Sequence, residues 1–220
     1  MSRPTAPQAC AAVLLASCFA SSPAPAQVEA EDARFERVAA VVEASMAELG
    51  IPGVALGIFW EGRSITRGFG VTSVENPLPV TGQTVFQAGS ITKTFTATAL
   101  MRLVESGRLD LDAPVRTYLP GFRVGDETAS ANATARILLT HMGGWEGDLF
   151  DDTGDGDDAL ARIVERMASL EQVAPFDTFW SYNNAGFYVA GRLLEVATGT
   201  SYEDAIRTLL IDPLQLRHTF

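Results

Sequence analysis

The sequence FQAGSITKTFTA, residues 86–97, begins a predicted helix that runs from about Ser90 to Ser106 and stops at Gly107. Ser90 and Lys93 are three residues apart, so their side chains share one face of the first helical turn. A serine hydroxyl is a weak nucleophile until a base takes its proton, and a neutral lysine amine can be that base. The spacing therefore makes Ser90 a candidate nucleophile and Lys93 its candidate base.

The use of basic residues strengthens this interpretation. A Ser-x-x-Lys pattern alone is weak, because two ordinary surface residues of a helix produce it by chance. However, Lys93 is the only lysine among 16 lysine and arginine residues. Arginine keeps its proton at any usable pH, and a randomly placed lysine would fall at this position in about one case in sixteen. Apolar neighbours should desolvate the site and favour the neutral amine, namely Phe95, Ala97, Leu100 and Met101.

A second candidate element lies about ninety residues further on, in the sequence SYNN, residues 181–184. The Tyr182 phenol can relay a proton if a nearby ammonium lowers its pKa. The Asn184 amide can bind both a lysine and a substrate carbonyl. The alternative is that Asn183 or Asn184 caps the following helix while Tyr182 only packs. After a Ser-x-x-Lys helix, we favour Tyr182 as catalytic and Asn184 as substrate-binding.

The surrounding chain indicates a hairpin followed by helices. Apolar positions at helical spacing predict a helix over 32–49 that Gly50 ends. Two apolar runs, 53–60 and 64–71, predict strands joined by Glu61-Gly62-Arg63. The face formed by Val54, Leu56, Ile58 and Trp60 is expected to pack on helix 32–49. Helices are predicted near 113–118, 134–141, 158–169 and 184–197, with Ser201 capping a last one.

Several segments together resemble the class C β-lactamase-related family, which includes DD-carboxypeptidases, esterases and D-aminopeptidases. They are residues 86–97, the Tyr-x-Asn of Tyr182 and Asn184, IPG at 51–53, GRLDLD at 107–112, LLTH at 138–141 and DPL at 212–214. The resemblance implies an α+β, β-lactamase/transpeptidase-like fold: an antiparallel sheet flanked by helices plus a mostly helical subdomain. It also implies an acyl-enzyme on Ser90, with Lys93 and Tyr182 managing protons.

Two features depart from this family pattern. No Lys/His-Thr/Ser-Gly strand motif follows before Phe220, so we expect residues 27–220 to be a catalytic domain that lacks its C-terminal strands. The middle position of Tyr-x-Asn is Asn183, where smaller residues are frequent in the family. The substrate class therefore stays open among β-lactams, D-amino-acid cell-wall peptides and small esters. The alternative function is a non-catalytic relative that binds cell-wall ligands, or an inactive fragment.

The first 26 residues are typical of a signal peptide. Arg3 is followed by an apolar run, 9–20, too short to span a bilayer, and Ala24-Pro25-Ala26 forms a small-residue cleavage site. The protein is thus expected to be periplasmic or secreted, and a lipid anchor on Cys18 is the competing possibility. Cys10 and Cys18, the only cysteines, both lie in this segment, so the mature chain would have no disulfide and no cysteine nucleophile.

Composition limits the other partners and cofactors. The net charge of −11 argues against nucleic acid, which requires clustered basic residues. The acidic loop 147–158 does not have the calcium-loop spacing, so it is interpreted as solvated, and no metal or other cofactor is expected. His141 is expected to form structural hydrogen bonds and His218 to be solvated. A Ser-His-Asp triad is disfavoured, since residues 88–92 do not form the Gly-x-Ser-x-Gly elbow.

Overall fold

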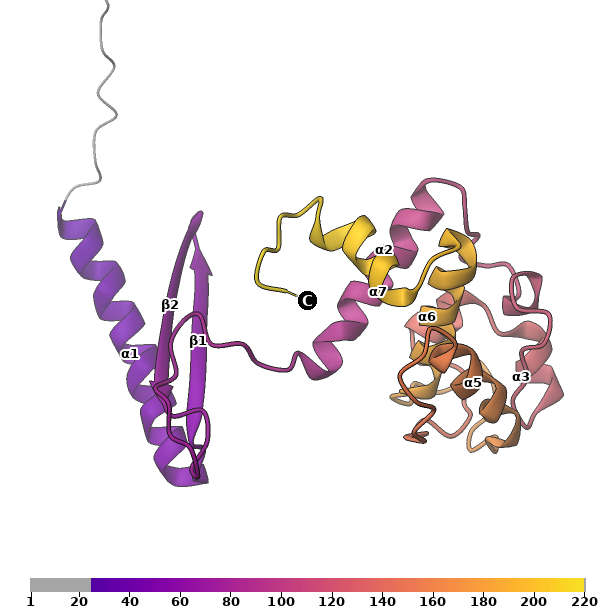
Figure 1. The fold of residues 1–220 in the computed structure, drawn as a ribbon, viewed down its shortest axis with the longest axis horizontal. Coiled ribbons are helices and arrows are strands. Elements are labelled where there is room, and N and C mark those ends of the chain that lie inside the picture. The colour runs from indigo at the N-terminus through magenta and orange to yellow at the C-terminus, as the bar shows by residue number, and fades with distance from the viewer. Residues whose placement is uncertain (1–24, 220) are drawn as a thin grey trace, which may run out of the picture. The chain divides into compact units, whose positions relative to one another are not determined.

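The computed structural model describes residues 25–219 of the chain. Residues 1–24 of the predicted leader 1–26, with both cysteines, lie outside the described residues. The chain divides between Thr84 and Val85 into two compact units, and Figure 1 shows the elements of each. The candidate site residues Ser90, Lys93, Tyr182 and Asn184 all belong to the second unit.

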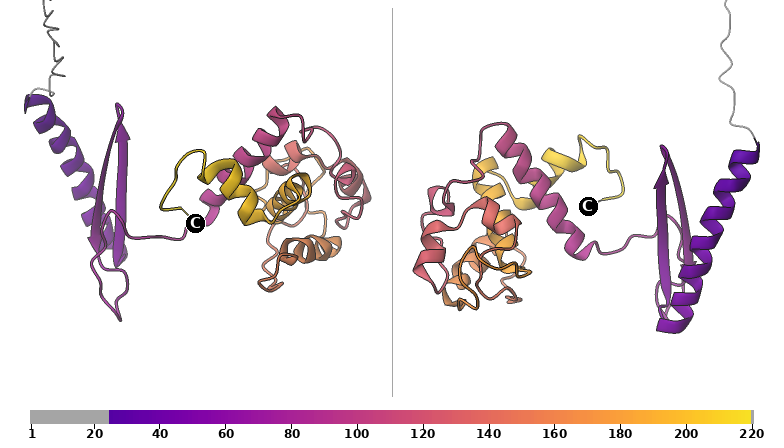
Figure 2. Two further views of the ribbon diagram at one scale, coloured as in Figure 1. Left: turned by 45° about the horizontal axis from the view of Figure 1, so that its top comes forward. Right: turned by 180° about the vertical axis from the view of Figure 1, so that it is seen from behind.

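Among its described residues, 25–84, the first unit contains one helix and one hairpin. Helix α1 (Pro25–Leu49) lies alongside the hairpin in Figures 1 and 2, and it contacts strand β1 (Gly53–Trp60). Strand β2 (Arg63–Gly70) completes the hairpin. The predicted end of α1 is confirmed, since Gly50 follows with a positive φ of 65° that terminates the helix. Its beginning lies at Pro25, seven residues before the predicted start at residue 32 (32 − 25 = 7).

The hairpin register differs by one residue from the prediction. Gly53 pairs with Gly70 and Trp60 pairs with Arg63, so the turn consists of two residues rather than three. Glu61 and Gly62 have φ values of 48° and 81°, the pair of positive values that a type I′ turn requires. Such a turn matches the twist of the strands, and Arg63 therefore already belongs to β2.

The hairpin and α1 share a small hydrophobic core. Phe35, Ala39 and Phe69 are buried there, and Leu56 and Ile58 pack against them as predicted. The prediction for Trp60 was wrong, because its side chain is 57% exposed. Trp60 is the last residue of β1, where the strand passes into the turn, and it borders an open cavity of about 210 Å³ beside Phe35.

The second unit consists of helices and the loops between them in its described part, with isolated β-bridges between Pro114 and Thr134 and between Trp145 and Gln172. Its elements are η1 (Gly89–Ile91), α2 (Thr92–Glu105), η2 (Val115–Thr117), α3 (Glu127–Asn132), α4 (Ala135–Leu139), α5 (Ala159–Arg166), η3 (Met167–Ser169), α6 (Ala185–Thr198), α7 (Tyr202–Ile206) and a π-helical turn η4 (Arg207–Ile211). The predicted helices correspond to η2, α4, α5 with η3, and α6. Ser201 caps α7 as expected, since its side chain accepts a hydrogen bond from the Asp204 N–H. Helix α3 was not predicted, although Asp126 caps it by accepting from the Ala129 N–H at 2.7 Å.

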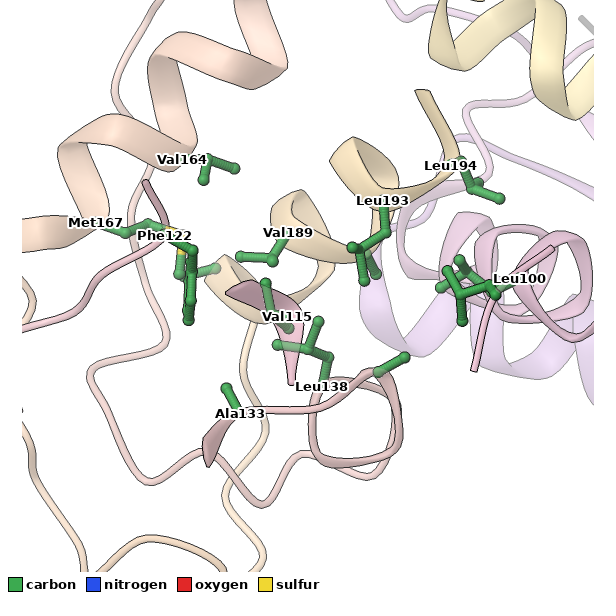
Figure 3. Packing of buried hydrophobic residues seen from close by; sticks show 14 of the residues in the cluster. Leu100, Val115, Phe122, Ala133, Leu138, Val164, Met167, Val189, Leu193 and Leu194 are labelled. Carbon is green, nitrogen blue, oxygen red and sulfur yellow. The ribbon is translucent and has the colours of Figure 1, made fainter. Parts of the chain in front are cut away.

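Helix α6 is at the centre of the second unit's core, where it contacts α2, α4, α5 and α7. Its residues Val189 and Leu193 lie beside Val115 and Leu138 in the close view of Figure 3. Trp145 is also fully buried in this core, at 1% exposure. Because α2 and α6 are held together by packing, their N-terminal ends are brought to the same place. That place is the candidate site.

Candidate active site

Ser90 and Lys93 lie at the start of the α2 segment, as their spacing predicted. Ser90 is exposed within η1 and Lys93 is half-buried in the first turn of α2. The Lys93 Nζ atom lies 3.3 Å from the Ser90 Oγ atom, within hydrogen-bond reach. Further along α2, Ala99 and Leu100 are fully buried and anchor the helix. The serine and the amine therefore lie at the start of a firmly packed element.

The surroundings of the amine include two rings that were not expected to enclose it. Met101, which was expected to desolvate the site, is 44% exposed on α2. Two aromatic rings approach the amine, that of Tyr182 just before α6 and that of Phe187 within α6. The Nζ atom lies 4.9 Å from the centroid of the Tyr182 ring and 5.5 Å from that of Phe187. Ring faces attract a cation at these distances, so aromatic groups partly enclose the amine.

Tyr182 and Asn184 converge on the same amine from the other side of the site. The Asn184 Oδ1 atom accepts a hydrogen bond from Lys93 Nζ at 2.7 Å, across 91 residues of sequence. Hydrogen bonds from Lys93 and Ser90 to the Tyr182 hydroxyl lower the pKa of that phenol from its ordinary value of 10. The structure thus brings together all four residues that the two motifs singled out.

The two asparagines of the SYNN segment have different environments. Asn183 is buried, with its Nδ2 donating to Trp145 O at 2.8 Å and its Oδ1 accepting from the Gly186 N–H at 2.7 Å. It thereby caps the start of α6, which is the structural alternative considered for this segment. Asn184 makes no such side-chain cap and directs its amide to Lys93. The side chain of Asn183, at the middle position of Tyr-x-Asn, therefore points into the protein rather than toward Ser90.

His141 holds the segment that carries Tyr182. Its Nδ1 atom accepts a hydrogen bond from the Asn183 N–H at 3.0 Å, and its backbone carbonyl accepts from the Ser181 N–H at 3.0 Å. Its ring centroid lies 4.6 Å from that of Tyr182 and 5.3 Å from that of Phe187. This agrees with the predicted hydrogen-bonding role. Burial and the nearby Lys93 charge lower the pKa of His141 from 6.5, so the ring is neutral at pH 7.

We expect His141→Phe to destabilise the protein more at about pH 8 than at about pH 5. Phenylalanine preserves the ring packing but removes the acceptor for the Asn183 N–H. The pKa of His141 is lower in the folded than in the unfolded protein, so its contribution to the free energy of unfolding is fully present above the unfolded pKa. This contribution is lost as the pH falls through the folded pKa.

Urea unfolding of the wild type and the variant at both pH values measures this difference. The same exchange at the exposed second histidine, His218→Phe, is the matched control, and it should change the free energy of unfolding little because the side chain is not packed. An equal destabilisation by His141→Phe at both pH values would contradict the neutral-acceptor role.

The acidic loop 147–158 has structural partners within the second unit. Arg162 pairs with Asp158, and Arg166 Nη1 lies 2.9 Å from Asp151 Oδ2. Among the residues that the structure describes, no three His, Cys, Asp or Glu side chains gather in a way that could hold a metal ion. Within the same residues, no helix combines the length and the apolar character needed to cross a membrane.

One contact at the site was not anticipated. The Asn184 Nδ2 atom donates to Asp148 Oδ1 at 2.9 Å, whereas the sequence placed Asp148 in a merely solvated loop. Phe187 also borders the amine but looked like an ordinary apolar residue of α6. Both residues reach the site only through the tertiary packing of α6. No local pattern in the sequence signals either role.

Comparisons with known proteins agree with this fold. The model of the Beta-lactamase family matches residues 38–220. Penicillin-binding protein 4 of Amycolatopsis lactamdurans is 42% identical over 177 residues, which cover 80% of this chain and 46% of that protein. A class C beta lactamase from Rhodobacter sphaeroides has a TM-score of 0.67 at 32% identity, covering 80% of this chain and 48% of that one. A structure of SurE with D-Leu has a TM-score of 0.72 at 30% identity, covering 84% and 41%.

The fold is that of the β-lactamase/transpeptidase-like proteins, with a small antiparallel sheet and many helices. The chain belongs to the Beta-lactamase family. It spans less than half the length of Penicillin-binding protein 4 and of the two solved structures compared with it.

Proposed function

We propose that this chain carries the nucleophile and the proton-transfer groups of a serine hydrolase that forms an acyl-enzyme on Ser90. The observation that carries the proposal is the position of Lys93 Nζ, 3.3 Å from Ser90 Oγ and 2.7 Å from Asn184 Oδ1. The Tyr182 ring centroid lies 4.9 Å from the amine, and the interaction with Lys93 and Ser90 lowers the pKa of its phenol. A nucleophile, a base and groups that orient the base are the parts that such catalysis needs.

The proton inventory of the site fits this chemistry. With one proton removed from the Lys93–Tyr182 pair, either a neutral amine or a phenolate is available to accept the Ser90 proton. The Ser90 oxygen then bonds to the carbonyl carbon, and the bond to the leaving nitrogen or oxygen breaks. The pair returns its proton to that leaving group, and water later hydrolyses the ester. Asn184 orients the amine and can present an amide N–H to the substrate.

The substrate is proposed to be an amide or ester of small size, with β-lactams and D-amino-acid cell-wall peptides as the first candidates. The name of Penicillin-binding protein 4 and the D-Leu in the SurE structure support these two classes. Small esters are the third candidate, because an ester carbonyl is more reactive toward the same serine than an ordinary amide carbonyl. No nucleic acid, metal or other cofactor takes part in this scheme.

Labelling with a fluorescent penicillin tests the proposal in the full-length protein. The label should remain on the denatured wild type, and the protein mass should rise by the whole mass of the β-lactam because ring opening expels nothing. Ser90→Ala should take up no label, which excludes direct reaction with other residues. Reversible binding without covalent label by the wild type would instead indicate the non-catalytic, ligand-binding relative.

We also propose that residues 1–26 direct export, which places the mature protein in the periplasm or outside the cell. The n-region, apolar run and small-residue site of the sequence support cleavage after Ala26. Mass analysis of the exported protein should show an N-terminus at Gln27. An N-terminus at a lipid-modified Cys18 would show the anchored form, and a cytoplasmic protein that begins at Met1 would contradict export.

A further inference from the structure

The loop that carries Asp148 is hydrogen-bonded to the start of α6. The Asn184 and Ala185 N–H groups both donate to Gly147 O, at 3.0 and 2.9 Å. One residue beyond Asp148, Leu149 O accepts from the Tyr188 hydroxyl at 2.9 Å. Asp148 is thus held between two anchored neighbours, although its own side chain is exposed.

The backbone of this loop also lies unusually close to the segment with Tyr182. A Cβ atom at Gly147 would lie 2.8 Å from Tyr182 O and 3.0 Å from Asn183 Cα. Only glycine fits at distances this short, so the backbone at Gly147 is in direct contact with the backbone of Tyr182 and Asn183. The carboxylate of Asp148 is therefore brought to the Asn184 amide by a rigid attachment rather than by a long flexible side chain.

The contact with Asp148 determines which way the Asn184 amide faces. Its Nδ2 donates to Asp148 Oδ1 at 2.9 Å, while its Oδ1 accepts from Lys93 Nζ at 2.7 Å. An ionised carboxylate can only accept hydrogen bonds, so the NH₂ end of the amide must face Asp148. The carbonyl end then faces Lys93. If the amide turned over, it would present donors to the amine and would compete with Ser90 for the lone pair.

We propose that Asp148 is a positioning residue, which acts through Asn184 to hold one N–H of Lys93 and so directs the lone pair of the amine toward Ser90. The proposal rests on the function proposed above, and it adds a third contact to the chain Asp148–Asn184–Lys93–Ser90. It follows the general arrangement in which a third group orients the base of a nucleophile. Here an amide transmits the orientation from the carboxylate to the base.

Asp148→Ala in the full-length protein should lower the rate constant of Ser90 acylation about tenfold to a hundredfold, the scale of a lost hydrogen bond to a charged group. The affinity of the complex that precedes acylation should change less than this rate constant does, because the proton leaves Ser90 only after the substrate has docked. Asp148→Asn should restore most of the rate, since its amide oxygen still accepts a hydrogen bond. Equal losses in Asp148→Ala and Asp148→Asn would overturn the proposal.

Two further variants separate positioning from general damage to the loop. Asp152→Ala removes a carboxylate of the same loop that accepts from the Gly154 N–H instead, and it should leave the rate unchanged. In an Asn184→Ala background, Asp148→Ala should cause no additional loss, because its effect passes through the missing amide. Additive losses in this double-mutant cycle would overturn the proposal.

A measurement without turnover separates this proposal from the proposed function. The side-chain ¹⁵N–¹H₂ resonances of Asn184 should shift in Asp148→Ala and stay in place in Asp152→Ala. Unchanged resonances in Asp148→Ala would show that the contact does not exist and would overturn the positioning role. A wild-type protein that never acylates, but whose Asn184 resonances respond, would contradict the proposed function and leave the contact established.

Discussion

Replacing Lys93 with arginine should slow acylation of Ser90 by about 10²–10⁴-fold, which is the range of a lost general base. Arginine keeps the positive charge and can still donate to Asn184 Oδ1, which now accepts from Lys93 at 2.7 Å. It cannot release a proton at usable pH, so it cannot accept one from Ser90. The exchange therefore distinguishes a base, which would be lost, from an ion-pair partner, which would survive.

Stopped-flow or single-turnover measurement with a chromogenic β-lactam or ester reporter gives the acylation rate constant of this variant. The reverse exchange at a remote ion pair, Arg162→Lys beside Asp158, is the matched control and should leave the rate unchanged. If Lys93→Arg retained most of the wild-type rate, the assignment of Lys93 as the base would be wrong.

Tyr182→Phe should reduce the acylation rate by about a hundredfold or more, within the range for acid–base groups. The ring would keep its packing 4.6 Å from His141, so the loss would be that of the hydroxyl alone. Hydrogen bonds from Lys93 and Ser90 lower the pKa of this phenol below 10. A base with a lowered pKa is deprotonated at lower pH, so the wild-type rate should rise with pH before the ordinary phenol range is reached.

The pH–rate profile of the acylation step tests this role of the phenol. The rise assigned to the Tyr182 phenol should be displaced or absent in Tyr182→Phe, because the phenol that titrates is removed. Tyr118→Phe deletes a remote hydroxyl that accepts from the Asp110 N–H at 2.7 Å, and it should leave the profile intact. An unchanged profile and rate in Tyr182→Phe would limit Tyr182 to packing.

The local elements of the fold could be predicted because their causes lie within a few residues. Gly50, Gly107 and Gly199 follow helices with positive φ, which glycine adopts at no steric cost. The predicted start of β2 was wrong by one residue because the sequence at 61–63 is compatible with both a two-residue and a three-residue turn. Helix α3 was overlooked because its six residues give no recognisable apolar period.

The sequence by itself determined the pairing of Ser90 with Lys93, because residues three apart on a helix are neighbours wherever that helix is placed. The resemblance of its motifs supplied Tyr182 and Asn184 as companions. Only the tertiary structure decided that Asn183 turns into the interior toward Trp145, while Asn184 reaches the amine as expected, since both positions depend on how α6 packs against α2. It alone decided that His141 and Asp148 support the site. Their contacts join segments 42 and 36 residues apart, and such contacts arise from packing rather than from local spacing.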